Sequence, residues 1–347
     1  MKKLNYLLLC ISLAFSLAGC SSSSKKTLRL FNWGEYMDES LLDEFEEEYD
    51  CKIIYETFDS NETMYTKLTS AGNKYDILVP SDYMIEQLIK EDRLQKIDWS
   101  KITNKDGLDS AIQNQSFDEN NEYWVSYFYG NVGIIYDKTK VDEEDLDGWN
   151  TLMNTKYAGD IYMYDSVRDS FMVALKALGY SMNTTDTNEI DEAYNWLIQQ
   201  NETMKPIYVL DTVIDSMINS EKAMAVVYSG DAAYILSENE NMGFYLPEEG
   251  TNYWFDGFVI TKECEEVDLA HAFIDFMCEK ENALRNTYEV GYLTSVIEAG
   301  NEAREEEFED NEAYQLRVEG QDECFTYLDN DTKTYYSNLW TKVLSNR

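Results

Sequence analysis

Short apolar segments alternate with amphipathic segments along most of the chain. Three apolar runs have the length of strands, at residues 27–31, 51–58 and 75–79. A stretch with helical periodicity follows each of them, and in the first such stretch Leu41, Phe45 and Tyr49 share one face behind Asp38, a predicted N-cap. This alternation predicts parallel strands with right-handed crossovers and helices on both faces of the sheet. We therefore expect an α/β fold that binds its ligand at the carboxyl ends of its strands.

A second series of the same kind follows an apolar, aromatic segment at residues 123–136, which we expect to be a crossing strand. Later strands are predicted at residues 160–164, 206–210, 222–228 and 253–260, and helices at residues 265–282 and 332–344. A chain of 347 residues is long enough for two domains, each with its own core. The pattern therefore predicts two α/β units.

The N-terminus has the layout of a secretory signal. Lys2 and Lys3 precede an apolar run at residues 4–17, which is too short for a membrane span with stop-transfer flanks. The sequence LAGC at residues 17–20 resembles the bacterial lipoprotein signal, in which cleavage precedes a cysteine that is then lipidated. We expect a signal peptide at 1–19, lipidation of Cys20 and a polar tether over 20–26. The alternative is an ordinary cleaved signal with a coincidental cysteine.

The charge of the chain excludes several classes of function. There are 28 Lys and Arg residues against 67 Asp and Glu residues, so the formal net charge is -39. A nucleic-acid binder needs clustered positive charge, and so does electrostatic attraction to anionic lipids. The only histidine, His271, lies in a predicted helix interior, which excludes multi-histidine zinc sites. We expect no nucleic-acid partner and no metal site.

Motifs of cofactor and hydrolytic chemistry are absent from the sequence. It contains no GxGxxG, no phosphate-binding loop of the Walker type, no HExxH and no GxSxG. The four cysteines beyond residue 26 are widely spaced without any CxxC, and we expect them to be packing thiols: Cys51, Cys264, Cys278 and Cys324. The sequence therefore predicts no cofactor.

Acids and aromatic residues recur together at the predicted strand ends. Trp33 and Tyr36 follow the first strand with an acid between them, and Tyr83 follows the third strand. Trp254 and Asp256 lie within a later strand. Rings that cover methylene groups, with carboxylates that neutralise ammonium groups, are what an aliphatic cation needs. We interpret Asp82 separately, as a helix N-cap.

Four segments carry a resemblance to a known family: NWGEY at 32–36, SNETMYTKL at 60–68, YDILVPS at 75–81 and GY at 291–292. They closely resemble the spermidine/putrescine-binding proteins of bacterial polyamine ABC importers, and the resemblance runs from about residue 27 to the end. It implies a two-lobed periplasmic-binding-protein fold of type II. Each lobe is then a mainly parallel sheet flanked by helices, and hinge closure encloses the ligand in the interlobe cleft.

The resemblance also implies roles for individual residues. Acids take the ligand nitrogens and rings flank its methylenes, while Ser166 stands where one spermidine-binding form has an acid and Asp231 where putrescine-type relatives carry one. Tyr228 replaces a family tryptophan. These departures leave the preferred polyamine open. The polyamine-binding residues implied in this way are Trp33, Glu35, Tyr36, Ser81, Tyr83, Asp169, Tyr228, Asp231, Trp254, Asp256 and Tyr292.

The expected organisation follows from the same resemblance. Lobe 1 comprises residues 27–136 and 255–303, and lobe 2 comprises residues 137–254 and 304–347. We expect a monomer without enzymatic activity, anchored by lipid to the extracytoplasmic face of the cell membrane. Its partners are a polyamine and the ABC permease of that membrane.

Other functions remain open at this point. A solute-binding protein for another cation is one, for example a ferric-ion binder that uses Tyr335 and Tyr336. A surface glycosidase with two carboxylates in an aromatic cleft is a second. A ligand-presenting module for a membrane receptor is a third.

Overall fold

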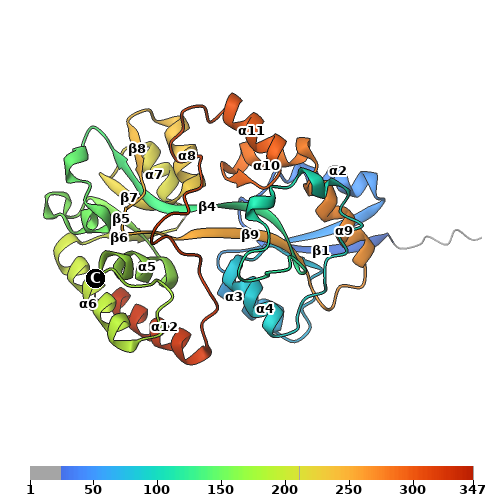
Figure 1. The fold of residues 1–347 in the computed structure, drawn as a ribbon, viewed down its shortest axis with the longest axis horizontal. Coiled ribbons are helices and arrows are strands. Elements are labelled where there is room, and N and C mark those ends of the chain that lie inside the picture. Colours follow the sequence, from blue (N-terminus) through green and yellow to red (C-terminus); the bar gives the residue numbers. More distant parts are fainter. Residues whose placement is uncertain (1–24, 211, 347) are drawn as a thin grey trace, which may run out of the picture.

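A computed structural model describes residues 25–210 and 212–346. Figure 1 shows two halves, each with strands inside and helices outside, joined at the centre by the long strands β4 (Trp124–Asp137) and β9 (Tyr253–Ile260). The predicted signal peptide and Cys20, the predicted lipidation site, lie outside the described residues. Within the described residues, no helix is long and apolar enough to span a membrane.

The first half begins with alternating strands and helices, as the hydrophobic pattern predicts. β1 pairs in parallel with both β2 and β3, and β3 pairs antiparallel with β9. The elements are β1 (Lys26–Trp33), α2 (Ser40–Glu48), β2 (Cys51–Phe58), α3 (Asn61–Thr69), β3 (Ile77–Leu78) and α4 (Asp82–Lys90). Short 3-10 helices follow at Thr103–Gly107 and Ser110–Ile112.

The second half repeats this arrangement after β4. β5 pairs in parallel with β6 and β7, while β7 and β8 pair antiparallel with β4. The elements are β5 (Ile161–Tyr164), α5 (Val167–Ala177), α6 (Thr187–Met204), β6 (Ile207–Val209), α7 (Val213–Ile218), β7 (Met224–Tyr228), α8 (Ser229–Glu238) and β8 (Met242–Tyr245). Short 3-10 helices precede β5 at Glu143–Asp145, Gly148–Met153 and Thr155–Tyr157.

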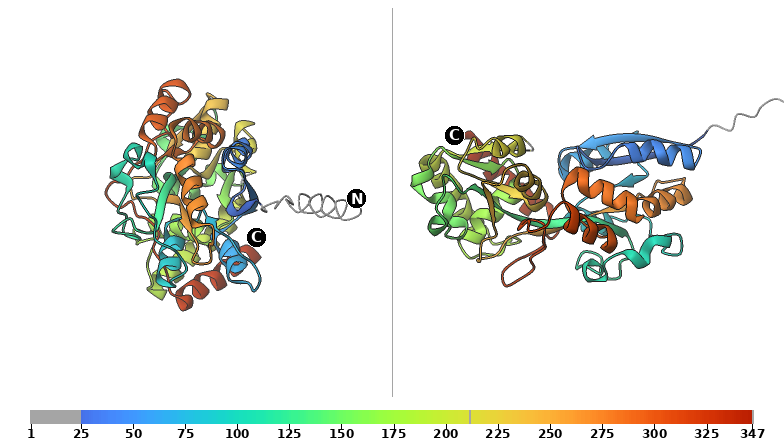
Figure 2. Two further views of the ribbon diagram at one scale, coloured as in Figure 1. Left: turned by 90° about the vertical axis from the view of Figure 1, so that its right-hand side faces the viewer. Right: turned by 90° about the horizontal axis from the view of Figure 1, so that it is seen from above.

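After β9 the chain returns through the first half and then crosses again to the second. The elements are α9 (Val267–Met277), α10 (Lys280–Val290), β10 (Leu293–Thr294), α11 (Ile297–Glu306) and α12 (Asn330–Ser345). Figure 2 shows the two halves side by side from above, with the chain between α11 and α12 passing from one to the other. We call residues 316–329 of this connection the crossing segment.

Eight strands lie on one continuous path, in the order β2-β1-β3-β9-β4-β7-β5-β6. β4 connects the two sheets because its residues change partner along its length. Its part up to Asn131 pairs with β9, and from Val132 onward it pairs with β7. β10 and β8 also pair with β4, off the main path.

Helix packing on the sheet follows from the apolar faces that the sequence predicts. In α2 the buried residues are Leu41, Leu42 and Phe45. The ring of Phe45 meets Phe273 of α9 edge to face, with 5.2 Å between ring centroids. Burial of such a side chain contributes about 1.5–3 kcal/mol, so this contact fixes α2 and α9 on the same face of the first sheet.

Several local predictions need correction. The residue before α2 is Glu39, and Asp38 instead accepts the N–H of Ser40 from outside the helix. The predicted helix 265–282 is two helices, because the chain turns between Met277 and Lys280. The predicted third strand shortens to Ile77–Leu78, because only these two residues pair with both β1 and β9.

The remaining thiols and the histidine have structural surroundings. Cys51, Cys264, Cys278 and Cys324 are buried and free. His271 is 1% exposed, its Nδ1 lies 2.7 Å from the carbonyl of Val267, and its Nε2 accepts the N–H of Asp98. The imidazole therefore joins α9 to the loop ahead of the 3-10 helices, as expected for a helix-interior residue.

Candidate functional site

Three buried or half-buried acids occupy the same kind of position in the fold. Asp82, Asp169 and Asp231 each lie in the first turn of a helix, α4, α5 and α8 respectively. Each of these helices follows a strand of the sheet, so the acids collect at strand carboxyl ends. The partial positive charge of a helix N-terminus favours a carboxylate there, which makes these positions suitable for holding buried negative charge.

Asp256 differs because it projects from β9 itself, at the centre of the molecule. It is 5% exposed, and its Oδ2 accepts a 2.7 Å hydrogen bond from the hydroxyl of Tyr36. Its backbone forms an isolated bridge with Ser81. Burial raises the pKa of Asp256 to about 6, while the Ser81 and Tyr36 hydroxyls act in the opposite direction. This carboxylate is therefore held in an environment that disfavours uncompensated charge.

Asp82 lies behind this position and is wholly buried. Its two oxygens accept the backbone N–H groups of Tyr83 at 2.6 Å and Phe255 at 3.1 Å. It is not the N-cap that the sequence suggested, because the cap position is Ser81 and Asp82 begins the helix. Burial raises the pKa of Asp82 to about 7. Since Phe255 lies between Trp254 and Asp256, Asp82 fixes the segment of β9 that carries both.

Asp231 is held by two tyrosine hydroxyls from different parts of the chain. Tyr164, the last residue of β5, donates to Oδ2 at 2.7 Å, and Tyr292 donates to Oδ1 at 2.7 Å. The residue before Asp231 is Gly230, where a Cβ would lie only 1.8 Å from the Tyr292 ring. Glycine is therefore required for the ring to approach α8.

Asp169 accepts two hydrogen bonds through the same oxygen. Ser166 donates at 2.6 Å and Tyr228 at 3.0 Å, both to Oδ2. Burial raises the pKa of Asp169. The neighbouring Arg168 holds its guanidinium 5.3 Å from the ring of Tyr83 and 4.2 Å from that of Phe325. A half-buried arginine thus lies at this end of the acidic group, and the sequence reasoning missed it.

Aromatic rings connect the acids. Trp254 meets Tyr292 at a 90° angle with 5.1 Å between ring centroids, and it meets Tyr228 at 78° and 5.8 Å. Tyr36 lies 5.6 Å from Tyr292 and 6.4 Å from Trp33. Five of the predicted ring residues therefore form one contiguous cluster. Tyr164 extends it, 4.8 Å from Tyr228, although the sequence analysis did not name it as a site residue.

Four polar atoms of this cluster are buried and have no hydrogen-bond partner among the described residues. They are Oδ1 of Asp256, Oδ1 of Asp169, and Nε1 of Trp33 and Trp254. Burying a carboxylate oxygen without a hydrogen-bond donor costs free energy. Its presence in the folded protein therefore favours a role in accepting a hydrogen bond from a ligand. Two carboxylate oxygens among ring faces are suited to accept N–H groups of an aliphatic cation.

Two predicted site residues, Tyr83 and Glu35, lie outside the ring contacts of this cluster, whereas Ser81 is joined to Asp256 by a backbone bridge. Ser81 and Tyr83 are tied to Asn61, whose amide donates 3.1 Å hydrogen bonds to both hydroxyls. Tyr83 also donates to Glu62 at 3.1 Å. Glu35 is exposed in the turn after β1 and has a positive φ of 50°. The SNETMYTKL segment therefore supports two of these residues through Asn61 and Glu62.

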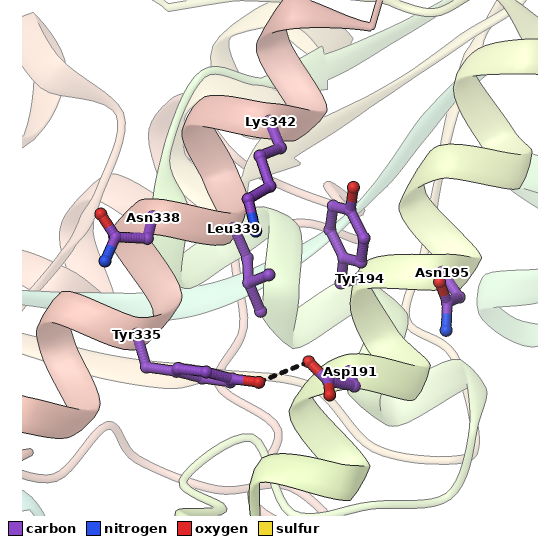
Figure 3. A pocket seen from close by; sticks show the side chains of 7 residues that line it. All are labelled: Asp191, Tyr194, Asn195, Tyr335, Asn338, Leu339 and Lys342. Carbon is purple, nitrogen blue, oxygen red and sulfur yellow. Dashed lines mark hydrogen bonds between the residues drawn. The ribbon is translucent and has the colours of Figure 1, made fainter.

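A surface pocket of about 460 Å³ lies elsewhere, between α6 and α12 (Figure 3). Tyr335, one of its lining residues, donates to Asp191 at 2.7 Å, whereas the adjacent Tyr336 is buried and donates to the carbonyl of Thr184. The two tyrosines thus have separate partners, which argues against a shared ferric ion. Among the described residues no group of three or more potential ligands could hold a metal.

Comparison with known proteins identifies the family. A family model described as bacterial extracellular solute-binding protein matches residues 40–315. The chain belongs to this family. The spermidine/putrescine-binding periplasmic protein of Escherichia coli is 33% identical over 295 residues, covering 85% of this chain and 84% of that protein. A putrescine/cadaverine-binding protein of Pseudomonas aeruginosa is 29% identical over 306 residues, covering 84% of each.

Solved structures of this family share the fold. A protein from Listeria monocytogenes superposes with a TM-score of 0.86 at 36% identity, covering 93% of this chain and all of that chain. The spermidine/putrescine ABC transporter substrate-binding protein of Streptococcus pneumoniae superposes with a TM-score of 0.75 at 36% identity, covering 93% of this chain and 99% of that chain. This solute-binding protein therefore has the type II periplasmic-binding-protein fold that the sequence predicted.

Proposed function

We propose that this solute-binding protein captures a polyamine, spermidine or putrescine, outside the cytoplasm and delivers it to an ABC importer. The observation that carries the proposal is the pair of buried, unpartnered oxygens on Asp256 and Asp169 within a cluster of aromatic rings. The names of the relatives from Escherichia coli and Pseudomonas aeruginosa support the same ligand class. No bond of the ligand changes, so the protein acts as a binder and not as an enzyme.

The proposed roles divide between charge and shape. Asp256, Asp231 and Asp169 accept N–H groups of the ligand, and Glu35 adds an acceptor at the exposed edge. The rings of Trp33, Tyr36, Tyr228, Trp254 and Tyr292 cover its methylenes, and Ser81 and Tyr83 complete the site.

The expected affinity follows from the magnitude of such contacts. A hydrogen bond to a charged group contributes roughly 1.5–3 kcal/mol, and a desolvated cation–π contact reaches about 2 kcal/mol. Two or three of the former and two of the latter are enough for about -8 kcal/mol, a micromolar dissociation constant, after the cost of association.

We further propose that the two halves move as lobes. Lobe 1 corresponds to residues 27–136 and 255–303, and lobe 2 to residues 137–254 and 304–347. Asp256 and Tyr36 then lie on lobe 1, and Asp169 and Asp231 on lobe 2, so closure brings acids from both sides to one ligand. The protein acts as a monomer, and the closed form is the one presented to the permease.

Anchoring at Cys20 completes the proposal. The diacylglyceryl group on this cysteine, together with a further acyl chain, holds the protein at the membrane. Residues 20–26 act as a tether. Replacement of Cys20 by serine is expected to release the protein into the medium. Retention of the Cys20→Ser variant in the membrane fraction would contradict lipid anchoring.

The ligand itself is tested by native mass spectrometry of the protein purified without denaturation. Spermidine or putrescine retained by the protein, with micromolar or tighter binding of the same compound in calorimetry, is the expected result. A retained sugar would instead favour the glycosidase reading, and absence of binding by both polyamines would overturn the proposal.

A further inference from the structure

The two halves also touch each other on α4 and α12, beyond the cluster of rings and acids. Lys333 of α12 extends its ammonium to the side-chain oxygen of Gln87 on α4, at 3.0 Å. Gln87 is 4% exposed and lies one turn beyond Tyr83 along α4. In Figure 1, α4 and α12 belong to different halves, so this hydrogen bond crosses between them directly.

The crossing segment adds a ring to the same place. The ammonium of Lys90 on α4 lies 4.8 Å from the ring centroid of Tyr327, and that of Lys333 lies 5.0 Å from it. The backbone N–H of Tyr327 donates to Glu86 at 2.7 Å, and Glu86 pairs with Lys90 at 2.5 Å. The ring of Tyr327 therefore contacts one cation from each half. We call Glu86, Gln87, Lys90, Tyr327 and Lys333 the clasp.

The clasp is separate from the residues assigned to the ligand. None of its five members belongs to the group of Asp169, Asp231 and Asp256 or to the rings that connect them. Three of its contacts join α4 to the other half and form only when the two approach each other: Gln87 with Lys333, and Glu86 and Lys90 with Tyr327. A contact present in one arrangement of the halves and absent from another shifts the equilibrium toward the first.

We propose that Lys333 and the clasp around Tyr327 are positioning groups that stabilise the closed arrangement of the two halves and thereby slow the release of ligand. The inference rests on the proposed capture of a polyamine between moving lobes. Because a ligand that needs the closed form binds in proportion to the population of that form, loss of the clasp weakens binding without any change at the ligand.

The test compares Lys333→Met with wild type. Methionine keeps most of the methylene stem but loses both the hydrogen bond to Gln87 and the cation over Tyr327. We expect the spermidine and putrescine release rates in stopped-flow displacement to rise by about threefold to tenfold, with little change in association rate. Small-angle scattering of the ligand-free variant should give a larger radius of gyration, whereas the ligand-saturated forms should agree.

Lys342→Met is the matched control, because Lys342 lies on the same helix but lines the pocket of Figure 3. It should leave release unchanged, and Lys333→Arg should restore slow release because it keeps the cation. Gln87→Met should raise the release rate and be non-additive with Lys333→Met. Equal effects of the Lys333 and Lys342 substitutions, or additive effects at Gln87 and Lys333, would overturn the clasp.

Failure of the clasp and failure of the proposed function give different results. If wild-type protein binds neither polyamine in calorimetry, the proposed function fails, but scattering of the ligand-free variants still tests the clasp. If wild type binds a polyamine and Lys333→Met matches it in release rate and in radius of gyration, only the clasp fails.

Discussion

The hydroxyl of Tyr36 donates a 2.7 Å hydrogen bond to Oδ2 of Asp256, across a separation of 220 residues in the sequence. This bond orients the carboxylate so that its other oxygen remains buried and unpartnered. The two oxygens of this carboxylate therefore have different roles. One oxygen is fixed by the protein, and the second is available to a donor from outside.

Replacement of Asp256 by alanine is expected to abolish polyamine binding while the fold persists. The variant loses the carboxylate that faces the ligand, and Tyr36 loses its acceptor. Isothermal calorimetry with spermidine and putrescine measures the loss, and circular dichroism checks the fold. The exposed Asp92→Ala variant is the control and should bind normally. Unchanged affinity in Asp256→Ala would contradict the site assignment.

Asp231→Ser is expected to weaken putrescine binding more than spermidine binding. The substitution removes the acceptor held by Tyr164 and Tyr292, at the position where we expect a diamine-specific acid. A loss of about tenfold for putrescine corresponds to about 1.4 kcal/mol, close to the lower end of the range for one charged hydrogen bond. Tyr164→Phe, which keeps the acid, should have a smaller effect. Equal losses for the two ligands would refute the selectivity role.

Polyamine affinity is expected to fall as the pH drops below about 6. The pKa of Asp256 is raised to about 6 by burial, and only the deprotonated form can pair with an ammonium group. Below pH 6, binding must first remove a proton, so the dissociation constant rises by up to tenfold per pH unit. Calorimetry from pH 5 to pH 8 measures this slope in wild type. A flat profile in wild type would argue against Asp256.

Asp82 is expected to make the ligand-free protein less stable as the pH rises, whereas polyamine affinity falls as the pH drops. Its pKa is raised to about 7 in the fold, so the folded state binds more protons than the unfolded state between about pH 4 and pH 7. This stabilisation is present below pH 4 and is lost as the pH rises through 7. It amounts to at most about 4 kcal/mol.

Urea unfolding at pH 5 and pH 8 tests this contribution by comparison of wild type with Asp82→Asn. The pH-dependent loss of unfolding free energy should be larger in wild type, because asparagine does not titrate. The difference between the two proteins removes the contribution of all other carboxyl groups. Parallel pH profiles would show that Asp82 is charged throughout this range.

Gly230→Ala is expected to weaken binding through the displacement of Tyr292. The added Cβ would lie 1.8–2.4 Å from three atoms of the Tyr292 ring, so the ring must move and its hydrogen bond to Asp231 is strained or lost. Gly107→Ala is a suitable control, because a Cβ there meets nothing within 4 Å. Calorimetry should show weaker binding only in Gly230→Ala. Normal binding would mean that the Tyr292–Asp231 pair is dispensable.

The hydrophobic pattern was sufficient to predict most strands, and β2 and β9 have the predicted ends. It failed where tertiary contacts decide the local structure. The break between α9 and α10 lies within a continuous amphipathic pattern, and nothing in the spacing marks Cys278 as the end of the first helix. The length of β3 depends on its neighbours β1 and β9, which a local pattern cannot register.

The candidate site was predictable where an acid or a ring follows a strand directly. Trp33, Tyr36, Tyr228, Trp254 and Tyr292 do meet in one cluster. Tyr164 was missed, although its place at the end of β5 was a usable signal. Asp82 and Arg168 were not predictable in their observed roles, because those depend on the distant residues Phe255 and Phe325.

β4 belongs to both sheets, pairing with β9 up to Asn131 and with β7 from Val132 onward. Neither half can lose this strand without leaving the neighbouring sheet with an unpaired edge. Pulling the two halves apart would therefore break hydrogen bonds between strands within each half. As a result, we expect thermal unfolding to be a single cooperative transition, even though we propose that the two halves pivot in the native state.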